Sequence, residues 1–154
     1  MTAVLLPIFP AHSRLLAEMH RICFVEPWDE AAMGGVLTMP GTSGVLASEP
    51  SHGASPERKP APQGFLLWRT AADEAEVLTL LVLPPYRRTG VAGRLLDHAI
   101  DAVRQAGVQA FFLEVASDNA AGRALYSSRH FEQVGMRPRY YRNSIDAIIM
   151  KRKI

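Results

Sequence analysis

The segment at residues 82–96 constrains the fold of this chain more than any other part of the sequence. A leucine-rich run ends at Pro84-Pro85, and a basic turn at residues 86–90 leads directly into a helical pattern. A helix that begins straight after a strand directs its first N–H groups, and the positive end of its dipole, at one spot. The segment therefore predicts an anion site built on backbone, because Gly90 and Gly93 carry no side chain that would obstruct a ligand.

The spacing of this turn separates it from two common nucleotide-binding motifs. No Gly-Lys-Ser/Thr follows the turn, as it would in a Walker A loop, and the GxGxxG dinucleotide fingerprint does not occur there. A plain interpretation also stays open, in which flexible glycines in a basic turn begin an ordinary helix. If the turn does bind a pyrophosphate, Arg87, Arg88 and Arg94 would supply the compensating positive charge.

The composition limits the class of protein that can carry this segment. A chain of 154 residues that is 48% hydrophobic is expected to form one domain over residues 1–154. A net charge of +2 without a basic stripe argues against a nucleic-acid partner, and no apolar run is long enough to span a membrane. The single Cys23 and the scattered histidines predict no disulfide and no metal site. Residues 1–10 lack the basic start of a signal peptide, so we expect a cytoplasmic protein.

The hydrophobic pattern predicts a mixed sheet with helices packed on it. In the first half we expect a helix over residues 11–22, a second helix capped by Asp29 and running to Leu37, and a short strand at residues 41–47. Residues 48–63 contain four prolines among Ser, Gly and charged residues, which predicts a mobile loop. The second half is expected to contain strands at 64–70 and 76–83, a helix at 90–106, a strand at 111–116, a helix at 119–128 capped by Ser117 or Asp118, and an antiparallel pair at 131–136 and 145–150 around a turn at 137–144.

Motifs in the second half resemble those of one enzyme family. The run Arg87-Arg88-Thr89-Gly90-Val91-Ala92 matches Arg/Gln-x-x-Gly-x-Gly/Ala and, between its strand and helix, resembles the acetyl-CoA pyrophosphate loop of GNAT acetyltransferases. Further matches narrow the resemblance to the bacterial ribosomal-protein-alanine N-acetyltransferases of the RimI type: Leu113-Glu114-Val115, Asn119-Ala120-Ala121, Ala124-Leu125-Tyr126, Phe131, Tyr140-Tyr141, the run 146–150 and Pro27-Trp28. The resemblance covers about residues 74–150. It implies an α/β GNAT fold (α+β in some schemes), whose mostly antiparallel central sheet is splayed in the middle and has helices on both faces.

The resemblance also implies where acetyl-CoA would bind. Its pyrophosphate would lie on the backbone of residues 88–93, and N–H groups of the splayed strand would meet the acetyl carbonyl and the pantetheine arm. In the family an asparagine at position 119 touches the pantetheine arm, although helix capping is the ordinary role of such a residue. The residues expected to bind acetyl-CoA are Leu80, Leu81, Val82, Arg87, Arg88, Thr89, Gly90, Val91, Ala92, Gly93, Arg94 and Asn119.

Two side chains are candidates for proton transfer. A carboxylate within an apolar strand is costly unless it is paired or used. Glu114 is therefore either a general base, the partner of a nearby arginine, or an outward residue at a sheet edge, and the resemblance implies the base. A helical tyrosine such as Tyr126 is ordinarily a half-buried core residue, but the matching family position is the general acid, and a phenol is protonated at neutral pH. Trp28, Tyr140 and Tyr141 are implied to bind the acceptor, with core or hinge packing as the alternative.

The acceptor is best matched to a protein N-terminus. A terminal α-amine has a pKa of about 7.7–8.0 against about 10.4 for lysine, so the neutral nucleophile is easier to obtain by about 3.4 kcal/mol. With the resemblance, this predicts acetylation of an N-terminal α-amine, foremost the N-terminal alanine of a small-subunit ribosomal protein. The alternatives are an acetyltransferase for lysine or a small free amine, and a non-catalytic acyl-CoA-binding sensor. The presence of both Glu114 and Tyr126 counts against the sensor.

The chain departs from the family pattern in two places. The loop at residues 48–63 is longer than usual, and Arg129-His130-Phe131 stands where the family commonly carries Leu-Gly-Phe. That glycine normally ends a helix in the left-handed conformation. Histidine tolerates positive φ better than most residues, so we expect His130 to adopt that conformation and assign it no catalytic role.

Overall fold

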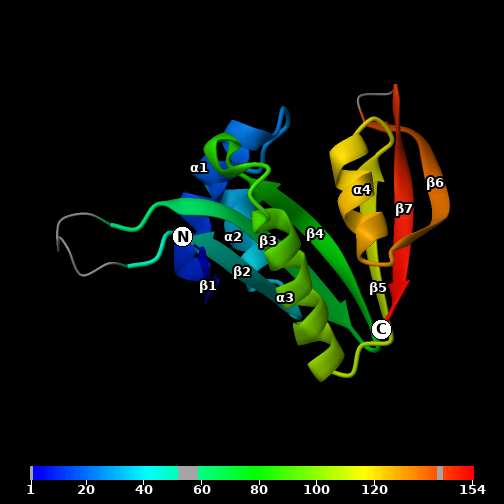
Figure 1. Ribbon diagram of the computed structural model, residues 1–154, viewed down its shortest axis with the longest axis horizontal. Coiled ribbons are helices and arrows are strands. Elements are labelled where there is room, and N and C mark those ends of the chain that lie inside the picture. Colours follow the sequence, from blue (N-terminus) through cyan, green and yellow to red (C-terminus); the bar gives the residue numbers. More distant parts are fainter. Residues whose placement is uncertain (1, 52–58, 142–143) are drawn as a thin grey trace.

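The computed structural model describes residues 2–51, 59–141 and 144–154, and its centre is one seven-stranded sheet (Figure 1). The strands lie in the order β1-β2-β3-β4-β5-β7-β6. Only the β4–β5 pair is parallel within the described part of the chain. The strands are β1 (Val4–Pro7), β2 (Thr42–Ser48), β3 (Pro62–Ala71), β4 (Glu74–Val82), β5 (Ala110–Ala116), β6 (Glu132–Tyr141) and β7 (Ile145–Lys153).

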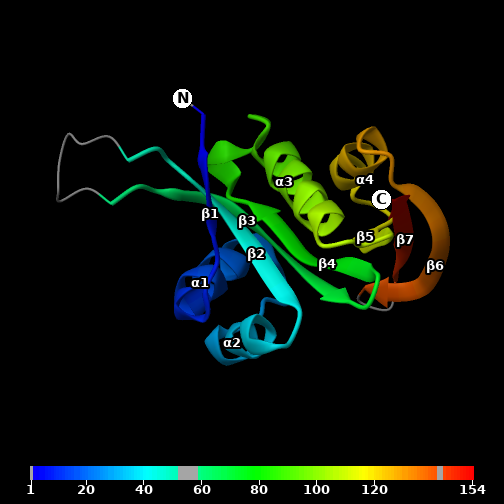
Figure 2. The ribbon, with the colours of Figure 1, turned by 90° about the horizontal axis from the view of Figure 1, so that it is seen from below.

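Helices cover both faces of this sheet, as Figure 2 shows. The helical elements are η1 (Pro10–His12), α1 (Ser13–Cys23), α2 (Glu30–Thr38), η2 (Pro84–Tyr86), α3 (Val91–Gln105) and α4 (Ala120–Ser128). One core lies on the side of α3 and α4 and includes Leu95, Leu96 and Phe111. The other lies beneath α1 and α2 and includes Leu16 and Phe65. None of the helices in the described ranges is long and apolar enough to cross a lipid bilayer.

The sheet opens between β4 and β5. These two strands pair over three positions only, from Glu74 opposite Ala110 to Glu76 opposite Phe112. Beyond Glu76, β4 continues alongside β3 as far as Val82, whereas β5 continues alongside β7. The two strands therefore form the diverging arms that Figure 1 shows in green and yellow. The splayed, mostly antiparallel sheet implied by the sequence is confirmed.

Several local predictions are also confirmed. Asp29 caps α2, where its carboxylate accepts a hydrogen bond from the N–H of Ala32 at 2.8 Å. His130 adopts a φ of 66°, the left-handed conformation expected where the family carries glycine. Gly107, at a φ of 82°, follows the last residues of α3. These features follow from local chain chemistry, which is why the sequence alone indicates them.

Four other local predictions were wrong or incomplete. Asn119, not Ser117 or Asp118, caps α4, accepting a hydrogen bond from the N–H of Gly122 at 2.9 Å. The loop predicted at residues 48–63 is shorter, because Ser48 ends β2 and β3 already begins at Pro62; residues 52–58 lie outside the described residues. The strand β1 was missed, because a four-residue strand has no periodic pattern to detect. The turn predicted at 137–144 is mostly strand, because an irregularity in register lets β6 continue along β7.

Candidate active site

The N-terminus of α3 provides an open set of backbone donors. Gly90 is the N-cap residue with a φ of 87°, and no side chain caps the helix. The N–H of Arg94 donates to the carbonyl of Gly90 at 3.1 Å, so the preceding amides of Val91, Ala92 and Gly93 have no intrahelical acceptor. A Cβ added at Gly90 would meet no atom within 4 Å. Free amides beside open space fit a pyrophosphate group, as the sequence predicted.

The three arginines of this segment differ in whether their side chains are free to bind an anion at the start of α3. Arg87 donates from Nε to the carbonyl of Val82 at 2.9 Å, and Arg94 donates to the carbonyl of Ala3. Both guanidinium groups are therefore held by backbone carbonyls of the protein. Arg88 is exposed and has no hydrogen-bond or ion-pair partner in the ranges that the structure covers. Of the three, Arg88 is the side chain left free to meet an anion at the helix end.

Gly90 can be tested against a matched glycine at the other end of the same helix. Gly90 and Gly107 have φ values of 87° and 82°, and an added Cβ would have open space at both. We expect Gly90→Val and Gly107→Val to lose similar stability, because valine is strained at positive φ. Only Gly90→Val should weaken acetyl-CoA binding, by about tenfold or more, which corresponds to about 1.4 kcal/mol. Calorimetry with both variants checks this, and equal affinity in the two would argue against an anion site at Gly90.

Three residues at the C-terminal end of β4 were predicted to bind acetyl-CoA, and two of them face the opening with their backbone groups. The N–H of Leu83 donates to the carbonyl of Gln63 in β3 at 2.8 Å. Because peptide groups alternate in direction along an antiparallel pair, Leu81 also faces β3, whereas Leu80 and Val82 face the side from which β5 has diverged. The side chain of Leu81 is buried in the core beneath α1 and α2. Leu80 and Val82 therefore direct their N–H groups to the opening, where the Val82 carbonyl already accepts from Arg87, and Leu81 does not face it.

Glu114 lies on the face of the sheet opposite α3 and α4. Its neighbours Leu113 and Val115 point into the core on the α3 side, so alternation along β5 directs Glu114 to the other face. There its Oε1 is 3.1 Å from Nε of Arg137 in β6. The arginine partner considered from the sequence is thus present. The carboxylate is not enclosed by this pair, because the side chains of Glu114 and Arg137 are 28% and 55% exposed.

A cavity of about 370 Å³ adjoins this ion pair where β4 and β5 separate. Its lining includes three carboxylates and two guanidinium groups, so a charged or strongly polar group would be well solvated there. No group of three or more side chains that could hold a metal ion was found in the described residues. The cavity is lined by Arg69, Ala71, Glu74, Ala75, Glu76, Phe112, Leu113, Glu114, Arg137 and Ile149.

Tyr126 is a buried residue of α4. It is 8% exposed, and its ring packs edge-on against Phe131 at 6.0 Å between centroids. Burial, and to a lesser degree Tyr141, raises the pKa of Tyr126 to about 12. Its hydroxyl has no hydrogen-bond partner among the residues that the structure describes.

Tyr141 interacts electrostatically with both candidate catalytic groups. Burial raises the pKa of Tyr141, and the nearby carboxylate of Glu114 raises it further. Tyr141 also interacts electrostatically with Tyr126, although Tyr126 packs in the core on the α3 side and Glu114 points to the other face. Tyr140 is 53% exposed, and its ring lies 5.4 Å from the guanidinium of Arg137. The structure thus places Arg137 against both Glu114 and Tyr140, and Tyr141 packs against Tyr140.

Trp28 lies apart from this cluster, against α1. Its backbone N–H donates to Nδ1 of His20 at 3.0 Å, and its ring stacks on His20 with centroids 4.9 Å apart. Nε2 of His20 lies 3.3 Å from Thr79 Oγ1 in β4. The packing considered as the alternative role of Trp28 is therefore present, and its contact with an acceptor stays a prediction.

His20 should make the stability of the protein depend on pH. Burial lowers the pKa of His20 to about 4, against about 6.5 in the unfolded chain. Between these values the unfolded chain binds the extra proton, so stability falls as pH decreases from about 6.5 to about 4. In His20→Gln this contribution, at most about 1.4 kcal/mol per pH unit, should vanish. Denaturant unfolding of both proteins across this range measures the difference, and parallel curves would contradict it.

Sequence reasoning missed the roles of His20 and Arg137. His20 falls on the apolar face of α1 together with Leu16 and Cys23, at helical spacing, and this position was a signal that it is buried. Arg137 carries no comparable signal. Its contact with Glu114 depends on β7 lying between β5 and β6, which no local pattern reveals.

Comparison with known proteins decides the family. Residues 13–131 match the model of the acetyltransferase (GNAT) family. The chain belongs to this family. The GNAT chain is 36% identical to N-alpha-acetyltransferase RimI of Mycobacterium tuberculosis over 149 residues, which are 92% of this chain and 87% of that protein. It is 39% identical over 89 residues to the [ribosomal protein bS18]-alanine N-acetyltransferase of Escherichia coli K12.

Structural comparison agrees with this assignment. The GNAT chain matches the crystal structure of the ribosomal-protein-S18-alanine N-acetyltransferase from Escherichia coli with a TM-score of 0.85 and 25% identity, over 99% of this chain and 94% of that one. Two of the sequence alignments are shorter than this structural match. The chain spans 60% of the length of the Escherichia coli K12 protein and 24% of a Mycobacterium leprae relative, while each match covers 56% of this chain.

Proposed function

We propose that this GNAT chain is an N-acetyltransferase that uses acetyl-CoA to acetylate the N-terminal α-amine of a protein. One observation carries the proposal: the sheet opens between β4 and β5, the free amides of α3 follow the end of β4, and Glu114 and Tyr126 lie on β5 and α4, on the other side of the opening. The relative from Mycobacterium tuberculosis, of which this chain covers 87%, is named an N-alpha-acetyltransferase. That name supports an α-amine as the acceptor.

Glu114 is the group that accepts a proton from the acceptor. An amine can attack a thioester only through its neutral form, and a carboxylate within reach, directly or through one water, removes the proton. The exposed ion pair with Arg137 does not prevent this, because such a pair contributes at most about 1 kcal/mol. An incoming ammonium group can take the place of the Arg137 guanidinium beside Glu114. The adjoining cavity, with Glu74 and Glu76 in its lining, favours a cation at this point.

Tyr126 is the group that donates a proton to the leaving sulfur. Acetyl-CoA, when bound, supplies the acetyl group on a thioester whose sulfur leaves as a thiolate. A phenol whose pKa is raised to about 12 stays protonated at neutral pH and can donate to that thiolate. The acceptor ammonium loses two protons to Glu114 in turn, one before attack, which passes on to solvent, and one from the tetrahedral nitrogen as the C–S bond breaks. The leaving sulfur gains one proton from Tyr126, and transfer of the second proton from Glu114 through solvent restores the phenol, so that one proton is released in each turnover. The free N–H groups of Leu80 and Val82 are suited to hold the acetyl carbonyl.

We further propose the N-terminal alanine of a ribosomal protein as the leading substrate. This rests on the relative in Escherichia coli K12, whose name specifies the alanine of ribosomal protein bS18. The preference for an α-amine over lysine has a physical basis, because the α-amine is easier to deprotonate by roughly 2.5 pKa units.

Turnover with a matched set of acceptors tests this proposal. The set contains a peptide that begins with a free alanine, the same peptide blocked at its N-terminus, and a blocked peptide with an internal lysine. We expect acetyl-CoA to be consumed with the free peptide alone. Consumption with the lysine peptide would identify a lysine acetyltransferase. Binding of acetyl-CoA without turnover of any acceptor would identify the sensor.

A further inference from the structure

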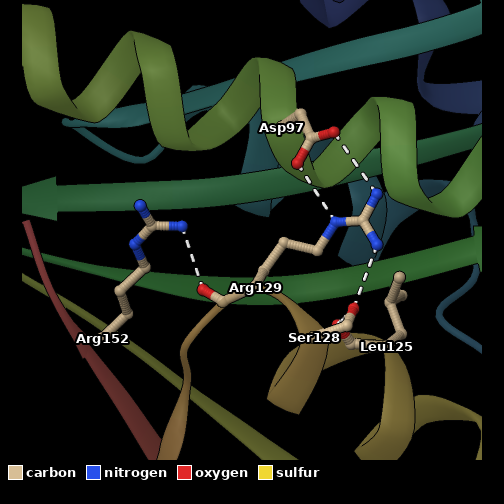
Figure 3. A network of polar contacts seen from close by, with 5 residues as sticks. All are labelled: Asp97, Leu125, Ser128, Arg129 and Arg152. Carbon is tan, nitrogen blue, oxygen red and sulfur yellow. Dashed lines mark hydrogen bonds and ion pairs between the residues drawn. The ribbon is translucent and has the colours of Figure 1, made fainter.

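Arg129, the residue that follows α4, forms an ion pair with the opposite arm of the structure. Its Nε lies 3.1 Å from Oδ1 of Asp97 in α3, and its Nη2 lies 3.3 Å from Oδ2 (Figure 3). This side-on arrangement uses both carboxylate oxygens and is the strongest geometry available to an arginine. The side chains of Arg129 and Asp97 are 29% and 57% exposed, so the pair lies at the surface and solvent screens it in part.

The guanidinium of Arg129 also lies against the first turn of α3. A Cβ added at Gly93 would come within 3.0 Å of Arg129 Cζ and nearer still to Nη2. Arg129 can therefore approach this turn only because residue 93 is glycine. The amide of Gly93 is one of the three free donors at the proposed pyrophosphate site, so Arg129 is in direct contact with the backbone that forms this site.

The backbone of Arg129 is held in the same helix terminus as Tyr126. The N–H of Phe131 donates to the carbonyl of Tyr126 at 3.0 Å, and the N–H of His130 donates to the carbonyl of Ser127 at 3.1 Å. With His130 at positive φ, these two bonds form a Schellman motif, which fixes the last turn of the helix. The edge-on contact between Tyr126 and Phe131 completes it. Arg129 lies inside this motif, so its backbone and Tyr126 move together.

Two further hydrogen bonds hold Arg129 in place. Nη1 of Arg129 donates to Ser128 Oγ at 3.0 Å, and Nη1 of Arg152 in β7 donates to the Arg129 carbonyl at 2.9 Å (Figure 3). By contrast, the pair with Asp97 is a polar link from this region to α3, added to the apolar core that α3 and Tyr126 share. Across the described residues, no other hydrogen bond or ion pair joins α3 to α4 or to Arg129.

We propose that Arg129 is a positioning residue, whose ion pair with Asp97 sets the distance between the anion site on α3 and the hydroxyl of Tyr126. The proposal rests on the proposed function, in which one acetyl-CoA molecule must reach both places. Because β4 and β5 are paired over three positions only, the sheet itself does not fix this distance at the open end.

Two ligands separate this role from a general effect on stability. CoA extends from the anion site towards Tyr126, whereas adenosine 3′-phosphate 5′-diphosphate has the pyrophosphate and lacks the pantetheine arm. In Arg129→Leu and Asp97→Asn we expect the Kd for CoA to rise about threefold to fivefold, which is the effect of losing an exposed ion pair. The Kd for the nucleotide without the arm should change less than about twofold, because the α3 amides are intact. Calorimetry, with competition titration for the weaker ligand, measures both values.

A control and a double variant make the test specific. Asp101→Asn removes a carboxylate of the same helix whose partner, Arg104, is also in α3, and it should leave both ligands unaffected. The double variant Arg129→Leu/Asp97→Asn should bind CoA no more weakly than either single variant, because both remove one interaction. If Arg129→Leu does not fold, Arg129→Lys retains the charge and the aliphatic stem, and Asp97→Asn provides the same measurement.

The outcomes separate this inference from the proposed function. If the wild-type chain binds CoA and the variants bind it equally well, the inference is wrong and the proposed function stands. Equal weakening of CoA and of adenosine 3′-phosphate 5′-diphosphate would also overturn it, since it would indicate damage to the anion site. If the wild-type chain does not bind CoA at all, both fail together.

Discussion

Replacing Glu114 with glutamine is expected to lower the turnover of peptide acetylation by about 10²–10⁴-fold at neutral pH, the usual contribution of a positioned base. Glutamine has nearly the same shape and can still accept a hydrogen bond from Arg137 Nε, so the change removes the base and keeps the contact. The loss should be largest below the α-amine pKa of about 7.7–8.0 and smaller above it, where much of the acceptor is already neutral. Steady-state rates from about pH 6 to about pH 9.5 measure this dependence.

Two control variants distinguish a base from an ion-pair partner. Glu76→Gln removes another carboxylate from the lining of the same cavity, and Arg137→Gln removes the partner while leaving the Glu114 carboxylate. Both should change turnover far less than Glu114→Gln. If Glu114→Gln and Arg137→Gln had the same small effect at every pH, Glu114 would be an ion-pair partner only, and the base would have to be another group.

Replacing Tyr126 with phenylalanine is expected to lower turnover by about two orders of magnitude or more, with little change in thermal stability or in acetyl-CoA affinity. The ring and its edge-on contact with Phe131 are kept. The lost hydroxyl has no hydrogen-bond partner in the described residues, so folding loses no contact with it. A raised pKa of about 12 means that the acid form persists throughout the usual assay range. Ionisation of Tyr126 should therefore cause no loss of rate below about pH 11.

The measurement combines turnover, unfolding and cofactor affinity on the same protein. Tyr140→Phe is a useful comparison, because Tyr140 is exposed and expected to bind the acceptor, so losing its hydroxyl should change the KM for the peptide more than kcat. Normal turnover in Tyr126→Phe would return this residue to the core, the role that its helical position suggested first. A fall in turnover matched by an equal fall in stability would have the same meaning.

The sequence by itself determined the parts of this protein that depend on neighbouring residues. The predicted order of strands and helices in the second half is confirmed, because periodicity, capping and turn chemistry act within a few positions along the chain. The open helix terminus at Gly90 is of this kind, since a glycine turn between a strand and a helix leaves its amides free. The splayed sheet followed from the family resemblance, because a pattern within one strand does not state which strand lies beside it.

Only the tertiary structure decided which charged groups meet. Arg87, Arg88 and Arg94 look equivalent along the chain, yet two of them are held by carbonyls of β4 and of the segment before β1, and one is free. The pairs Glu114–Arg137 and Asp97–Arg129 likewise join elements distant in sequence. A long charged side chain has many rotamers and no periodic pattern, so its partner depends on the packed positions of strands and helices, which the local sequence does not encode.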